Sequence, residues 1–133
     1  MGHMTKALYL AGRILLGLYF IVPGMMKVMN FGGTAEYMAT HGMIFIPFFL
    51  TLTIILQLAG GSCLVIGYRQ QQVSFVLAGL VLVISVVMHN FWAMEEGLQR
   101  AHETQNFIKN MAIMAGLLVL AGGYIPQSRQ TVQ

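Results

Sequence analysis

Residues 12–30 read GRILLGLYFIVPGMMKVMN, a mostly apolar stretch about as long as a helix that crosses a bilayer. Steps of four and three residues place five of its side chains within roughly 40° of one direction on a helix. They are Arg13, Gly17, Phe20, Gly24 and Lys27. A charged side chain in a membrane span is costly unless it faces protein, water or a partner. We therefore expect this stripe to face the interior of a membrane protein.

The composition of the whole chain agrees with a membrane location. Of its 133 residues 57% are hydrophobic and only 8% are charged, whereas soluble domains are about a quarter charged. The seven Lys and Arg residues are scattered, so we expect no nucleic-acid partner. The lone Cys63 cannot form an intramolecular disulfide. Residues 1–4 (MGHM) are read as an expression remnant before the natural start.

Hydropathy predicts an all-α polytopic membrane protein with four transmembrane helices in a compact bundle. The four spans are expected at about 7–29, 44–67, 73–94 and 107–125, within one domain over residues 1–133. The semi-polar residues 30–43 are too polar to cross and too long for a tight turn, so an interfacial or re-entrant segment is expected there. Residues 95–106 are read as the longest hydrophilic loop, and residues 127–133 as a polar tail.

The distribution of basic residues gives an orientation. Four spans put both termini on one side of the membrane, and that side carries four Lys or Arg residues against three on the other. The excess of basic residues marks the cytoplasmic side. We expect a multi-pass protein of a bacterial-type inner (plasma) membrane with both termini in the cytoplasm.

The polar residues of the spans form two groups. On the inner side, Arg13 lies about 9 Å and Gln57 about 15 Å from the ends of their helices, so they are expected to form an inner polar pair. The second group gathers at the outer end and includes Lys27, His89, Asn90, Trp92, Gln105, Lys109 and Asn110. A structural reading remains open for this group, because lysines near helix ends reach to the interface and Trp belongs to aromatic belts.

Four stretches of the chain resemble the DoxX family of small four-helix membrane proteins. They are GRILLGLYFIVPGMMKVMNFGGTAEYMATHGM, LQLAGGSCLVIGYR, HNFWAM and QNFIKNMAIMAGLLVLAG. Two departures stand out: Gln57 occupies a position where the family usually has Glu, and GGYIPQSRQ replaces a Gly-Pro-Gly ending followed by Asp. The resemblance implies a membrane subunit linked to electron transfer from thiosulfate or sulfur to quinone, or to oxidative-stress complexes.

Two functions stay open. The first is a redox subunit that binds a quinone or a small anion at the outer end. In it His89 and Lys109 are the catalytic candidates, and no cofactor is covalently bound. The ligand-binding candidates are Lys27, Asn90, Trp92, Gln105 and Asn110. A soluble or membrane oxidoreductase, or a second copy of the chain, is the expected partner besides the lipid bilayer.

The alternative is a non-enzymatic binder or transporter of a small molecule or lipid, or a membrane scaffold for a partner enzyme. Whether the chain is itself catalytic is not decided by its sequence. No metal site is expected, because no E-x-x-H or H-x-x-x-H pair is present and the carboxylates fall in predicted loops.

Overall fold

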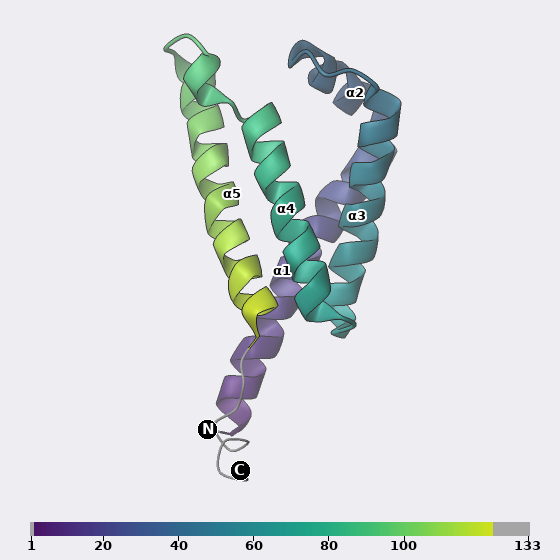
Figure 1. Cartoon of the computed structure of the whole chain (residues 1–133), viewed down its shortest axis with the longest axis vertical. Coiled ribbons are helices and arrows are strands. Elements are labelled where there is room, and N and C mark those ends of the chain that lie inside the picture. Colours follow the sequence, from purple (N-terminus) through teal and green to yellow (C-terminus); the bar gives the residue numbers. More distant parts are fainter. Residues whose placement is uncertain (1, 124–133) are drawn as a thin grey trace.

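The structure is a computed structural model that describes residues 2–123, and within that range all its regular elements are helical. In chain order they are α1 (His3–Met29), α2 (Phe31–Thr40), α3 (Ile46–Ile66), α4 (Gln70–Met88), the short 3₁₀ helix η1 (Phe91–Ala93) and α5 (Leu98–Gly122). Figure 1 shows two helix pairs, α1 with α3 and α4 with α5, which meet near the α3–α4 turn and diverge toward the other end. We call the end with α2 and η1 the open end, and the end with residues 67–69 the closed end.

Glycines bring α1 and α3 into close contact. A Cβ atom at Gly17 would lie 2.6 Å from the backbone oxygen of Gly61, and a Cβ at Gly61 would lie 2.6 Å from the oxygen of Gly17. Small residues at such positions let membrane helices approach each other closely. This contact sets the alignment of the antiparallel pair, in which Gly24 lies beside Gln57.

An apolar core joins the two pairs. Its buried members are Phe20, Leu64, Leu77, Ala78, Val81 and Leu117, which come from α1, α3, α4 and α5. A second, smaller cluster of Met38, Leu50 and Ile54 seats α2 on α3. The bundle is therefore held together by the first cluster, while α2 belongs to the α1–α3 side.

The stripe predicted on the first helix is confirmed. The buried residues of α1 are Gly17, Phe20 and Gly24, and Arg13 and Lys27, at the two ends of the stripe, are partly buried. Apolar side chains on the other faces of the helices stay exposed. Three segments are long and apolar enough to cross a membrane: His3–Met29, Ile46–Ile66 and Gln70–Ala93. The outward apolar faces therefore suit contact with lipid.

Two predicted boundaries need correction. The last helix begins at Leu98, well before residue 107, because the polar residues 98–106 include good helix formers and Gly97 ends the preceding loop. The third long helix ends at Met88 rather than at residue 94, and a bend at His89 leads into η1. The expected end of the last span at residue 125 and the polar tail at 127–133 lie outside the described residues.

Candidate functional site

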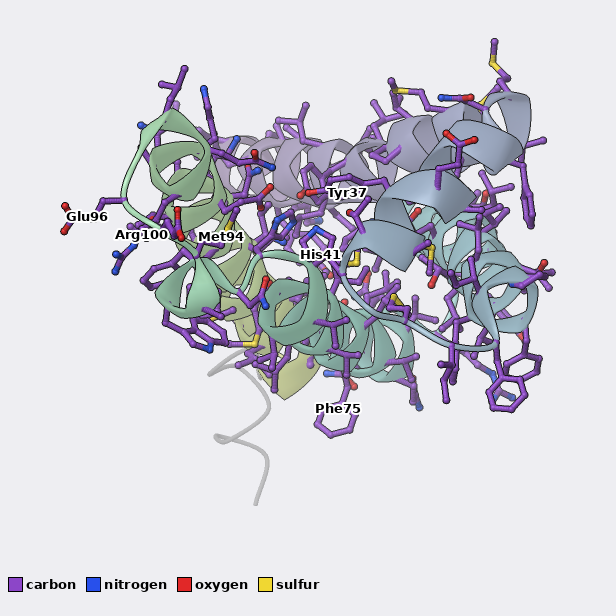
Figure 2. All side chains as sticks on the ribbon, turned by 90° about the horizontal axis from the view of Figure 1, so that it is seen from above. Tyr37, His41, Phe75, Met94, Glu96 and Arg100 are labelled. Atoms are coloured by element: carbon purple, nitrogen blue, oxygen red, sulfur yellow. The ribbon has the colours of Figure 1, made fainter. Side chains whose placement is uncertain are left out.

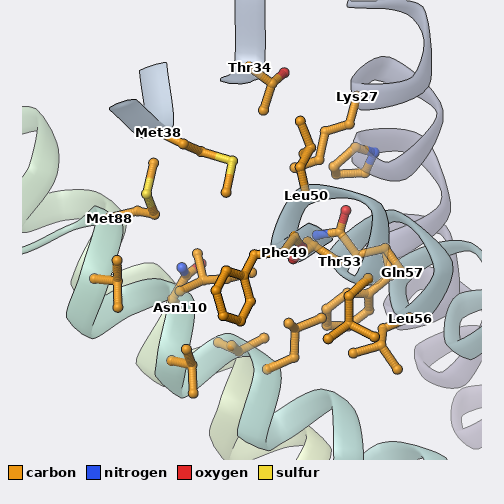
Figure 3. A pocket seen from close by; sticks show the side chains of 18 of the residues that line it. Lys27, Thr34, Met38, Phe49, Leu50, Thr53, Leu56, Gln57, Met88 and Asn110 are labelled. Atoms are coloured by element: carbon orange, nitrogen blue, oxygen red, sulfur yellow. Dashed lines mark hydrogen bonds between the residues drawn. The ribbon is translucent and has the colours of Figure 1, made fainter. Parts of the chain in front are cut away.

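A cavity of about 790 Å³ lies between the two helix pairs on the side of the open end. About half of its lining residues are Leu, Ile, Val, Met or Phe, and most of these come from α3 and α4. Figure 3 shows Lys27, Phe49, Gln57 and Asn110 around this space. The volume falls within the range of small-molecule sites, which is about 300–1,000 Å³.

Polar side chains line the same cavity. They are Tyr19, Lys27, Asn30, Thr34, Tyr37, Thr53, Gln57, His89, Asn106, Lys109 and Asn110. The described lining contains no carboxylate, and neither lysine lies within ion-pair distance of one among residues 2–123. The lining is therefore positively charged and rich in hydrogen-bond donors, which suits an anionic or carbonyl-bearing ligand.

A buried carboxylate lies directly behind this lining. Glu103 on α5 is 6% exposed, and its Oε2 lies 2.5 Å from Nδ1 of His89 at the end of α4. The hydroxyl of Tyr37 on α2 donates a hydrogen bond of 2.8 Å to Glu103 Oε1. Figure 2 shows Tyr37 and its neighbour His41 directed toward the centre of the molecule, whereas Glu96 points away from it. Three elements thus meet at one carboxylate.

These contacts shift the pKa values of the Glu103 carboxyl and the Tyr37 hydroxyl. Burial of Glu103 opposes its ionisation, but the hydrogen bonds from His89 and Tyr37 outweigh burial and lower the pKa of its carboxyl below 4.5. Burial, the hydrogen bond to Glu103 and repulsion by its carboxylate raise the pKa of Tyr37 to about 12. At neutral pH, Glu103 is therefore an ionised acceptor and Tyr37 a protonated donor.

Two further contacts concern the cavity itself. The hydroxyl of Tyr19 on α1 donates to Asn110 Oδ1 on α5 at 3.1 Å, so a second hydrogen bond connects the two helix pairs. Gln57 is 6% exposed, and its Oε1 has no hydrogen-bond partner among residues 2–123. A buried acceptor without a partner is costly, so a ligand that donates a hydrogen bond to Gln57 would relieve that cost.

The structure brings four of the seven residues expected at the outer end to this cavity: Lys27, His89, Lys109 and Asn110. Three others, Asn90, Trp92 and Gln105, are not part of its lining. The indole of Trp92 packs edge-on against the rings of Phe91 and Phe107, with centroids 5.3 and 5.6 Å away.

The expected inner pair of Arg13 and Gln57 is not formed. Arg13 Nη1 donates a hydrogen bond of 3.0 Å to Gln70 Oε1, and its guanidinium packs on Gly67. Gln57 lies beside Gly24, eleven residues further along α1, which corresponds to about 16 Å. The depths of Arg13 and Gln57 were each counted from the end of their own helix. These ends do not lie at the same level, because α1 extends past the closed end of α3 (Figure 1).

Sequence reasoning missed Tyr37 and Glu103 as members of the site. Glu103 was assigned to a hydrophilic loop, where a solvated charge is the usual explanation. A signal was nevertheless present, because Glu103, Asn110 and Leu117 are spaced by seven residues and are the buried residues of α5. Seven residues are close to two helical turns, so this spacing marks one helix face.

Comparisons with known proteins agree with the predicted resemblance. A family model described as DoxX matches residues 8–90. The inner membrane protein YqjF of Escherichia coli (strain K12) is 33% identical over 113 residues, which are 84% of this chain and 80% of that protein. The inner membrane protein YphA of the same organism is 28% identical over 120 residues, 90% of this chain and 85% of that protein. No solved structure matches the chain significantly.

Proposed function

This chain belongs to the DoxX family of membrane proteins, and we propose that its cavity binds the head group of a quinone as part of an electron-transfer or oxidative-stress system. The observation that carries the proposal is the combination of apolar walls with an end that holds lysines, a histidine and amides but no carboxylate. A membrane quinone has the matching parts, namely an apolar body and polar oxygens that accept hydrogen bonds.

In the proposed complex the head group lies among Lys27, His89, Lys109 and Asn110. The ammonium and amide groups can donate hydrogen bonds to its oxygens, and the ammonium groups stabilise negative charge on them. Gln57 lines the same cavity, and its unpartnered Oε1 would accept a hydrogen bond from a hydroxyl of the reduced, hydroquinone form. Trp92, Asn90 and Gln105 have no direct part in this complex, because they do not line the cavity.

The proposal includes an arrangement in the membrane. Helix α5 is 25 residues long and packs along α4, so we assign its part from residue 107 onward as a fourth span beside α1, α3 and α4. Helix α2 has ten residues and is about 15 Å long, too short to cross, so we place it at the outer interface. The relatives are named inner membrane proteins, and we assign this chain to the same membrane with its termini in the cytoplasm.

Electrons would come from the substrate or from a partner oxidoreductase. The chain has one cysteine and no flavin- or nicotinamide-binding sequence pattern, so a redox centre would be supplied by the partner. A second copy of the chain is the other partner that we consider.

The proposal is tested by organic extraction of the purified protein, chromatography of the extract and titration with a short-chain benzoquinone. We expect a co-purified quinone, and weaker binding in Lys27→Ala and Lys109→Ala. Lys6→Ala is the matched control, because Lys6 is exposed on α1 and does not line the cavity. The proposal is wrong if no quinone co-purifies and added quinone does not bind.

The same cavity also suits a non-enzymatic role, since a positively charged lining can hold a small anion or a lipid head group. Uptake of an anionic solute into proteoliposomes distinguishes this role from the first. Flux that depends on Lys27 and persists without quinone would favour transport.

A further inference from the structure

The contact between Glu103 and His89 leaves one imidazole nitrogen for a ligand. His89 lines the cavity, whereas Glu103 is not among the lining residues. Nδ1 of His89 is engaged by Glu103 Oε2 at 2.5 Å. Nε2 has no hydrogen-bond partner in the part of the chain that the structure describes. A ligand in the cavity would therefore meet His89 through Nε2.

Glu103 is itself held in place from more than one direction. Tyr37 donates to Oε1 from α2, and His89 contacts Oε2 from the end of α4. A fixed carboxylate beside Nδ1 keeps the proton on that nitrogen and leaves the lone pair of Nε2 free. It also stabilises the imidazolium that forms when Nε2 accepts a proton, as in hydrolases that pair Asp with His.

We propose that Glu103 is a positioning residue that makes His89 Nε2 the proton acceptor for a ligand hydroxyl, so that the cavity takes a hydroquinone- or phenol-type ligand in its ionised form. This inference rests on the proposed function, because it requires the head group to lie beside His89. In the step, the O–H bond of the ligand breaks, its electron pair stays on oxygen and an N–H bond forms at Nε2.

The surroundings favour the resulting ion pair. Lys27 and Lys109 line the same cavity, and the described lining contains no carboxylate that would repel a phenolate. The imidazolium lies between the phenolate and the Glu103 carboxylate, so positive and negative charges alternate. A neighbouring group of opposite charge favours the ionised form of both the phenol and the imidazole.

The test uses a nitrophenol that carries an alkyl tail, together with its methyl ether. The nitrophenol absorbs visible light strongly only when ionised, and the ether cannot ionise. Both are added to the purified full-length protein in detergent, and the ionisation of the bound phenol is compared with that in protein-free micelles. We expect an ionisation constant at least about tenfold larger on the protein.

Two variants separate the role of Glu103 from a general effect of charge. In Glu103→Gln, the ionisation constant of the bound phenol should fall most of the way back to its value in micelles, while the ether still binds. Glu96→Gln removes an exposed carboxylate that points away from the molecule (Figure 2), so it should ionise the phenol as the wild type does. If Glu103→Gln no longer binds the ether, His89→Gln is tested in its place. The inference then requires that His89→Gln bind the ether without ionising the phenol.

The outcomes bear differently on the two proposals. Equal ionisation in the wild type and in Glu103→Gln, or a bound phenol that stays neutral, overturns this inference and leaves quinone binding intact. Failure of the wild type to bind either compound also overturns this inference, and quinone binding is then decided by the benzoquinone titration described above. Ionisation that depends on Glu103 and His89 but not on Glu96 supports the inference.

Discussion

The hydroxyl of Tyr37 donates a hydrogen bond of 2.8 Å to Glu103, although the two residues lie 66 positions apart. Tyr37 belongs to α2, which packs on α3, and Glu103 belongs to α5, which packs on α4. The bond therefore links the two helix pairs where they diverge. Among residues 2–123 it is one of two such links beside the cavity, the other being the bond between Tyr19 and Asn110.

Tyr37→Phe should loosen this link. A hydrogen bond to a charged group contributes about 1.5–3 kcal/mol, so we expect the free energy of unfolding to fall by about that amount. Unfolding in detergent, followed by circular dichroism, measures the loss. The control is Tyr68→Phe, since Tyr68 is exposed and donates no side-chain hydrogen bond among the described residues. An equal effect of both substitutions would contradict the role of the Tyr37 bond.

The ionisation of Glu103 predicts how stability depends on pH. Because its pKa is lowered on folding, the carboxylate stabilises the protein fully above about pH 4.5, and this contribution is lost as the pH falls through the lower folded pKa. The melting temperature of the wild type should therefore exceed that of Glu103→Gln at neutral pH and approach it in acid. A constant difference between the two proteins down to about pH 3 would contradict the lowered pKa.

Gly17→Ala should destabilise the α1–α3 pair. The added methyl group would meet the backbone oxygen of Gly61 at 2.6 Å, and overpacking of this kind costs about 1–3 kcal/mol. Gly12→Ala is the matched control in the same helix, because nothing lies within 4 Å of a Cβ there. The control should be neutral or slightly stabilising, since Ala is the better helix former. Unfolding in detergent compares the two, and equal stability would exclude the close approach.

A double-mutant cycle tests the partner of Arg13. Arg13→Ala and Gln70→Ala should be non-additive by about 0.5–3 kcal/mol, because the two side chains share a hydrogen bond of 3.0 Å. Arg13→Ala and Gln57→Ala should be additive within about 0.5 kcal/mol, as expected of side chains more than about 10 Å apart. The free energy of unfolding of each single and double variant gives both coupling energies. Coupling to Gln57 but not to Gln70 would restore the pairing that the sequence predicted.

Much of the fold follows from hydropathy and helical periodicity. The face of α1 with Gly17, Phe20 and Gly24 was predictable because its small and charged residues recur at helical spacing among bulky apolar ones. The start of α5 was not predictable in this way. Residues 98–106 form a polar stretch of helix that has no hydropathy signal, so they looked like a loop.

The site was also predictable only in part. Lys27, His89 and Lys109 were noticed because polar groups are rare in apolar spans, and all three line the cavity. Tyr37 and Glu103 lie in polar segments, where hydropathy does not distinguish a buried carboxylate from a solvated one. For Glu103 the signal was its seven-residue spacing from Asn110. The partner of Arg13 depends on the alignment of α1 with α3, which is set by the Gly17–Gly61 contact rather than by the ends of the helices.

The central claim is that a quinone occupies the cavity between the helix pairs, and a steric plug tests it most directly. Gly79 lines the cavity, and a Cβ there would meet no atom within 4 Å, so the side chain of Gly79→Leu starts in open space and adds bulk to the cavity. Gly116→Leu is the control, because Gly116 has equal space but does not line the cavity. The measurement is the dissociation constant of a short-chain benzoquinone for the three proteins.

We predict that Gly79→Leu weakens quinone binding by at least about tenfold, or about 1.4 kcal/mol, while Gly116→Leu binds as the wild type does. Equal affinity of all three proteins would place the quinone outside the cavity and contradict the claim.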